Sequence, residues 1–297
     1  MAVPPTFASP SGFLGLSRTD READFVVAGI PFDIGTTNRA GARDGPYAIR
    51  RASRMLIDGA HPEFWVEPAT LGLADFGDLS IALGDTPESL RLIEQQVADI
   101  PHLLALGGDH DITLPLLRAL ARRRGKKLAL VHFDAHVDTW PDNFGQRYAH
   151  GSVFYHAIEE GLIDPRQMVQ IGIRSPVQRD VWDWTLERGV TVLTAQDVHS
   201  TGVVTAGERI RAVVGKTPTY LSFDVDALDP AFAPGTGTPE IGGLMSWQAQ
   251  AILRQLRGVP FVGMDVVELS PAYDVAEITA LAAATIVWEY LALVGSA

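Results

Sequence analysis

The chain has no cysteine among its 297 residues, and this absence excludes thiolate zinc sites and iron–sulfur clusters. Positive charge is also scarce, because 24 Lys and Arg residues stand against 36 Asp and Glu residues, for a formal net charge of -12. Such a protein repels nucleic acid and anionic membranes, so we expect neither as a partner. The acidic balance favours a small cationic substrate.

Linkers, charge blocks and low-complexity segments are missing as well, which predicts a single domain over residues 1–297. Residues 1–15 lack the basic start and apolar core of a signal peptide, so we expect a cytoplasmic protein. One long apolar segment, 278–295, carries Glu289 and falls slightly short of the ~20 residues that a membrane span needs. It is expected to be a buried or oligomer-facing helix.

Short apolar runs alternate with helical patterns along the whole chain. The expected strands are 24–30, 103–106, 128–133, 168–173, 190–193, 220–223 and 261–264. Most are continuously apolar, as is typical of strands covered on both faces. Among the helix starts, Thr86 before Pro87 is expected to be an N-cap. The alternation predicts a parallel sheet flanked by helices, and the pattern alone leaves an open sandwich and a closed barrel as alternatives.

Acidic residues and histidines follow three of these strands. They are His110 after strand 103–106, Asp134, His136 and Asp138 after strand 128–133, and Asp224 and Asp226 after strand 220–223. Alternate side chains share a face, and ligands gather beyond the carboxyl ends of parallel strands, so these groups can converge. Four carboxylates and two imidazoles are enough for two cations, and such a set suits a hard divalent ion such as Mn²⁺.

Four motifs together resemble the ureohydrolase family of arginases and agmatinases. They are Gly-Gly-Asp-His at 107–110, Asp-Ala-His-Val-Asp at 134–138, the stretch from Ser-Phe-Asp-Val-Asp at 222–226 to Pro-Gly-Thr-Gly-Thr-Pro-Glu at 234–240, and Met-Asp-Val-Val-Glu-Leu-Ser-Pro at 264–271. The resemblance covers nearly the whole chain. It implies a three-layer α/β/α sandwich with a mainly parallel sheet of about eight strands, two Mn²⁺ per subunit, a homotrimer or homohexamer, and hydrolysis of a linear guanidinium compound to urea and an amine.

The same resemblance implies a role for each site residue. One ion would be held by His110, Asp134, Asp138 and Asp224, and the other by Asp134, His136, Asp224 and Asp226. The shared Asp134 and Asp224 would offset the repulsion between two dications, which lower the pKa of the attacking water. Asp138 would receive the proton of the hydroxide, His150 would relay protons to solvent, and Glu268 would orient the guanidinium through two N–H bonds.

The loop between Asp138 and His150 lacks the Ile-Asn continuation of arginases, and the segments 150–157 and 160–165 that follow it resemble agmatinase sequences. Agmatine, hydrolysed to putrescine and urea, is therefore the first predicted substrate, with Asp142 as the acceptor for its distal ammonium. The alternatives are 4-guanidinobutyrate and 3-guanidinopropionate, whose carboxylate Arg147 or Arg39 would bind.

Two predictions from other classes are weaker. A single-zinc deacetylase of similar fold leaves Asp134, Asp138 and Asp226 without a role. An inactive metal-binding subunit would have lost a ligand or Glu268, and neither is lost. His132 is in register with Asp134 but lies deeper in its strand, so it is expected to be a hydrogen-bonded core histidine and not a ligand.

Overall fold

The computed structural model of the chain describes residues 11–296. Its centre is one eight-stranded sheet with the order β2-β1-β3-β8-β7-β4-β5-β6, and every paired strand is parallel. The strands are β1 (Phe25–Ile30), β2 (Leu73–Asp78), β3 (Leu103–Gly107), β4 (Leu128–Phe133), β5 (Ile163–Ile173), β6 (Thr191–Thr194), β7 (Thr219–Asp224) and β8 (Phe261–Val267). The sheet is open, with β2 and β6 at its edges, so the barrel alternative is wrong.

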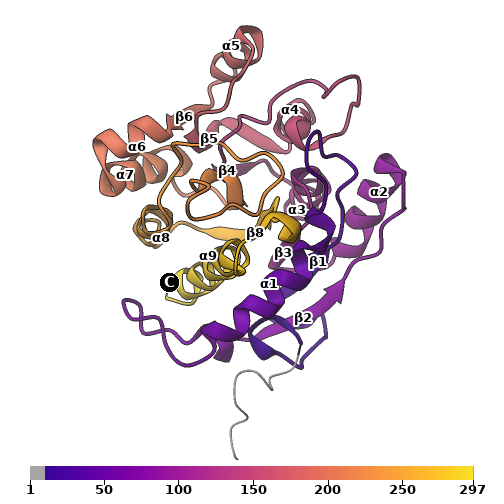
Figure 1. Cartoon of the computed structure of the whole chain (residues 1–297), viewed down its shortest axis with the longest axis vertical. Helices are drawn as coiled ribbons and strands as arrows, with labels where there is room; N and C mark the ends of the chain where they lie inside the picture. Colours follow the sequence, from indigo (N-terminus) through magenta and orange to yellow (C-terminus); the bar gives the residue numbers. More distant parts are fainter. Residues whose placement is uncertain (1–10, 297) are drawn as a thin grey trace, which may run out of the picture.

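Helices cover both faces of this sheet (Figure 1). They are α1 (Gly45–Ser53), α2 (Thr86–Val97), α3 (Thr113–Arg124), α4 (Val153–Glu159), α5 (Arg179–Glu187), α6 (Ala195–Thr201), α7 (Val203–Val214), α8 (Ser246–Gln255) and α9 (Ile278–Gly295). One apolar core joins the sheet to α1 and α6–α9, and a second joins the opposite face to α2, α3 and α4. Successive strand residues such as Leu130 and Val131 enter different cores, which explains the continuous apolar runs. The predicted three-layer α/β/α sandwich is confirmed.

Two local predictions were inaccurate. Strand β2 was not expected, because its sequence Leu-Ala-Asp-Phe-Gly-Asp is interrupted by polar residues and Gly77, as an edge strand tolerates. Helix α2 begins at Thr86, but its N-cap is Asp85, whose side chain accepts a hydrogen bond from the Glu88 backbone N–H. That residues 1–297 form a single domain stays a prediction.

Helix α9 is the one helix within residues 11–296 that is long and apolar enough to cross a membrane, yet 61% of it is buried inside the protein. It packs against α1, α8 and β8. Its single acid, Glu289, is buried and lies 3.0 Å from both His61 Nε2 and Arg254 Nε. These contacts explain the apolar sequence as that of a core helix whose one charge is paired.

Candidate metal centre and active site

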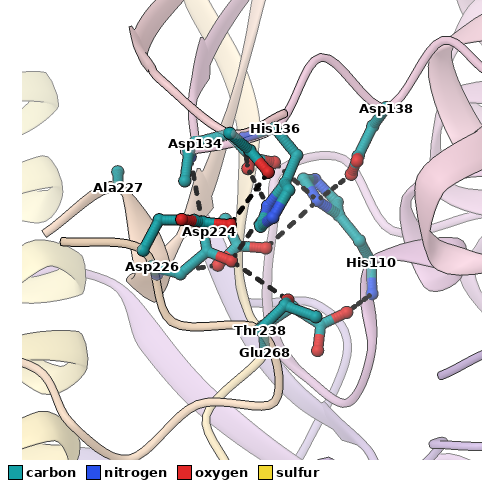
Figure 2. Close-up of polar contacts among 12 residues, drawn as sticks. His110, Asp134, His136, Asp138, Asp224, Asp226, Ala227, Thr238 and Glu268 are labelled. Atoms are coloured by element: carbon teal, nitrogen blue, oxygen red, sulfur yellow. Dashed lines mark hydrogen bonds and ion pairs between the residues drawn. The ribbon is translucent and has the colours of Figure 1, made fainter. Parts of the chain in front are cut away.

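All six predicted metal ligands lie together at the carboxyl edge of the sheet (Figure 2). His110 opens a 3₁₀ turn just after β3, Asp224 is the last residue of β7, and Asp226 lies in the next turn. Asp134 to Asp138 follow β4 directly. Since β3, β8, β7 and β4 are neighbours in the sheet, their ends bring the six side chains into one cluster.

Three carboxylate oxygens surround the Nδ1 atom of His110. They belong to Asp138, Asp134 and Asp224, at 2.9, 3.2 and 3.4 Å respectively. Nδ1 is nonetheless a buried atom without a hydrogen-bond partner among residues 11–296. A ring nitrogen close to several carboxylates, but bonded to none, is arranged as the ligands of a shared cation are.

A second group forms around His136. Its Nδ1 lies 3.1 Å from Asp226 Oδ2 and 3.2 Å from Asp134 Oδ1. Asp134 therefore turns one oxygen toward His136 and the other toward His110. This is the arrangement expected of a carboxylate that bridges two ions.

The carboxylates of this cluster outnumber its imidazoles, four to two. Burial raises the pKa of Asp138 and Asp224, and neighbouring carboxylates raise it further. Burial alone would lower the pKa of His110 and His136, but the surrounding carboxylates outweigh burial and raise it well above its usual value. Four buried carboxylates repel one another, and two divalent cations would supply four compensating charges. The donor set, all carboxylate and imidazole, fits such ions.

Glu268 lies at the floor of the site, beside His110 (Figure 2). Its Oε1 accepts a hydrogen bond from the His110 backbone N–H at 2.8 Å and lies 3.1 Å from His150 Nδ1. Its Oε2 is buried and has no partner among the described residues. The backbone of Glu268 is left-handed, with φ 65°, a strained state for a glutamate that the surroundings must hold. A buried acceptor is thus fixed in place without a donor from residues 11–296.

His150 joins Glu268 to the loop after β1. Its Nε2 lies 2.7 Å from Thr37 Oγ1, and its Nδ1 faces Glu268. Burial lowers the pKa of His150, but the charge of Glu268 and the hydrogen bond to it outweigh burial and raise the pKa to about 9. The ring can therefore hold a proton at neutral pH.

His132 is a hydrogen-bonded core residue in this structure. Its Nδ1 accepts from the Gln170 amide at 3.1 Å, so its Nε2 is the donor to Asp134 Oδ2 at 2.7 Å. His132 thus orients the acid that faces both metal-site histidines. The contribution of Gln170 was not predicted, although a glutamine inside the apolar run 168–173 was a signal for it in the sequence.

A cavity of about 550 Å³ opens onto the cluster. Its lining includes His136, Asp138, Asp224 and His150. Arg39, Trp140 and Glu240 line it as well. Glu240 accepts a hydrogen bond from Ser175 Oγ at 3.1 Å, and it forms no ion pair among residues 11–296. Arg39 lies over the ring of Tyr273, with 4.9 Å from Cζ to the ring centroid.

Asp142 and Arg147 are not brought to this cavity. Both line a separate hollow on the outer side of the loop after β4. Asp142 Oδ1 accepts a hydrogen bond from the Gly145 backbone N–H at 2.8 Å, so the carboxylate closes a turn of its own loop. This position does not support Asp142 as the acceptor for a substrate tail.

Comparison with known proteins yields close relatives. A family model described as Arginase family matches residues 23–292. The agmatinase of Salmonella enteritidis PT4 is 47% identical over 290 residues, which cover 94% of this chain and 92% of that protein. A solved structure of a hypothetical agmatinase from Burkholderia thailandensis has a TM-score of 0.91 and 45% identity, covering 97% of this chain and 91% of that one. Proclavaminate amidino hydrolase from Streptomyces clavuligerus has a TM-score of 0.93 and 40% identity, covering 99% of both chains.

Proposed function

Because this chain belongs to the arginase family, we propose that it hydrolyses agmatine to putrescine and urea at a centre that binds two Mn²⁺. The observation that carries the proposal is Asp134, whose two oxygens face the Nδ1 atoms of His110 and His136. The agmatinases among the relatives support the substrate. The absence of thiols and the carboxylate-rich ligand set support manganese.

Each ion would have four protein ligands. One would be held by His110, Asp134, Asp138 and Asp224, and the other by Asp134, His136, Asp224 and Asp226. Bound there, the two cations would lower the pKa of a water molecule and stabilise the charge that develops on the substrate.

The protein's own groups then bind the substrate and move its protons. Glu268 Oε2, buried and without a partner, accepts an N–H of the guanidinium, which holds the planar group toward the metal ligands. Asp138, at the cavity wall, accepts the proton of the attacking water. His150 lines the same cavity and relays protons between the site and solvent, so that it can supply the proton that the departing amine requires.

The tail of the substrate distinguishes two candidates. Glu240 presents to the cavity a carboxylate that forms no ion pair among the described residues, which favours the distal ammonium of agmatine. Arg39 lines the same cavity and would favour a carboxylate tail. Hydrolysis of 4-guanidinobutyrate or 3-guanidinopropionate is therefore the second candidate function.

We further propose a homotrimer or homohexamer and a cytoplasmic location. Exposed apolar side chains near the starts of α8 and α9, among them Ile241, Trp247 and Ile278, support contact between subunits. The absence of cysteine, which fits a reducing compartment, supports the location.

The test is a panel of urea-release assays on protein loaded with manganese. Agmatine, 4-guanidinobutyrate, 3-guanidinopropionate and L-arginine are compared at equal concentration, and bound metal is counted by mass spectrometry. We expect two Mn²⁺ per chain and the highest kcat/KM for agmatine. A guanidino acid hydrolysed at least tenfold faster than agmatine would establish the second candidate instead. Release of no urea from any of the four would refute the proposed activity.

A further inference from the structure

Asp265 is a fully buried carboxylate in the interior of β8, where an apolar residue would be expected. It forms no ion pair among residues 11–296. Its hydrogen bonds come from three hydroxyl groups: Ser222 Oγ at 2.7 Å to Oδ1, and Thr113 Oγ1 at 2.7 Å and Tyr220 OH at 3.0 Å to Oδ2. Burial of an unpaired carboxylate costs free energy even when three hydroxyl groups donate to it, so we expect this residue to have a function.

The sheet places this carboxylate beside the metal site. Ser222 of β7 and Asp265 of β8 are register partners, and Tyr220 lies two residues earlier on the same face of β7. Gly263 faces Tyr220 and leaves room for its ring, because a Cβ there would lie 3.1 Å from Tyr220 Cε2. Thr113 is the first residue of α3, which follows the turn that begins at His110.

The direction of the hydrogen bonds follows from the chemistry of the groups. An ionised carboxylate only accepts, so the single hydroxyl proton of Ser222 is donated to Asp265. Ser222 Oγ must then accept from His110 Nε2, 2.8 Å away. This fixes the proton of the His110 ring on Nε2 and leaves the lone pair on Nδ1, the atom that faces Asp134, Asp138 and Asp224.

We propose that Asp265 is a positioning residue of the metal centre: through Ser222 it holds His110 in the tautomer and orientation that bind one of two divalent cations. The inference rests on the proposed function only in that the cluster binds two Mn²⁺. Partners of this kind behind a ligating histidine typically change metal affinity by about 10–100-fold.

The hydrogen-bonded chain from Asp265 through Ser222 to His110, called the relay below, acts on one ion and not on the other. His136 forms hydrogen bonds or close ion contacts through its backbone N–H and Nδ1, and within residues 11–296 no comparable partner holds its Nε2. Loss of the Asp265 charge should therefore weaken the ion at His110 and leave the ion at His136 near its original affinity. General damage to the core would weaken both.

The replacement Asp265→Asn tests the direction of the relay. If the amide oxygen keeps the hydroxyls of Thr113 and Tyr220, its NH₂ group faces Ser222 and donates to it. Ser222 must then donate its proton to His110 Nε2, which moves the ring proton to Nδ1. The metal-binding nitrogen is thereby blocked, although the side chain keeps its size.

Full-length protein loaded with Mn²⁺ is titrated with a chelator, and the metal that remains is counted. We expect Asp265→Asn to release one ion at 10–100-fold lower chelator strength than the wild type, with the second ion little changed. Ser222→Ala should behave in the same way, and Ser222→Thr, which keeps the hydroxyl, should restore the wild-type release. Tyr220→Phe is the matched control, because it removes a donor to Oδ2 and leaves the link to His110 intact.

Two results would overturn the inference. The first is that Asp265→Asn releases both ions at the same chelator strength as the wild type. The second is that Asp265→Asn and Tyr220→Phe both bind the two ions more weakly, and to the same extent. If Asp265→Asn does not fold, the comparison of Ser222→Ala with Ser222→Thr decides in its place, and equal release from these two contradicts the relay. Wild-type protein that holds fewer than two Mn²⁺ would instead refute the proposed function, and the relay with it.

Discussion

Replacement of His150 by alanine should slow turnover strongly while both metal ions stay bound. His150 is not within the ligand groups, and it contacts Glu268 at 3.1 Å and Thr37 Oγ1 at 2.7 Å. The change would remove the proposed proton relay to the departing amine and one of the two donors to Glu268 Oε1. General acid–base groups typically contribute 10²–10⁴-fold. We therefore expect kcat to fall by that factor, which corresponds to about 3–5 kcal/mol of activation free energy.

The pH dependence of kcat is an independent test of proton transfer by His150. The pKa of His150 is raised to about 9, so the ring is protonated below that pH and loses its proton as the pH rises through it. If the protonated ring serves the departing amine, wild-type kcat should be steady at neutral pH and fall above about pH 9. His150→Ala should lose this limb of the profile as well as most of its activity.

The assay is urea release from agmatine between pH 7 and 10, with bound manganese counted on the same samples. His199→Ala serves as the control, because His199 is an exposed histidine outside the cavity. Loss of metal from His150→Ala, or kcat within threefold of the wild type, would refute the assignment of His150 as a proton relay.

Three further replacements test the shared metal ligand, the guanidinium-binding carboxylate and the buried acid of α9. Asp224→Ala removes an acid that the two ions would share, so activity should disappear and metal content should fall; normal turnover would contradict a binuclear centre. Glu268→Gln keeps the shape of the side chain but turns one acceptor into a donor. We expect kcat/KM to drop about 10–100-fold with both ions retained, because a hydrogen bond to a charged group is lost. An unchanged kcat/KM would exclude guanidinium binding at Glu268. Glu289→Ala leaves His61 and Arg254 without their buried carboxylate. It should lower the free energy of unfolding, measured by urea denaturation, by about 3 kcal/mol. A loss below about 1 kcal/mol would show that the buried pair contributes little.

The sheet and the clustering of the candidate metal ligands were largely predictable because both follow from a simple rule. Parallel strands show as continuous apolar runs, and groups placed just beyond their carboxyl ends meet at one edge. Seven of the eight strands were expected on this basis, and so was the position of the six candidate ligands. Strand β2 was missed because an edge strand buries less surface and tolerates Asp75 and Gly77 in its sequence.

The surroundings of the site were less predictable because contacts across the fold decide them. Asp142 was chosen as the nearest acid in sequence, but its loop folds outward and its carboxylate closes a turn. Glu240 reaches the cavity from a motif about a hundred residues away. Asp265 did leave a signal, a charge inside an apolar strand, but its three donors come from β7 and α3 and are joined only by the fold.

Anomalous diffraction from crystals of the manganese-loaded protein would locate the bound ions directly. We expect two manganese peaks, one on each side of Asp134, with His110 Nδ1 ligating the first ion and His136 Nδ1 the second. A single peak, or two peaks that do not share Asp134, would contradict the binuclear centre on which the proposed activity depends.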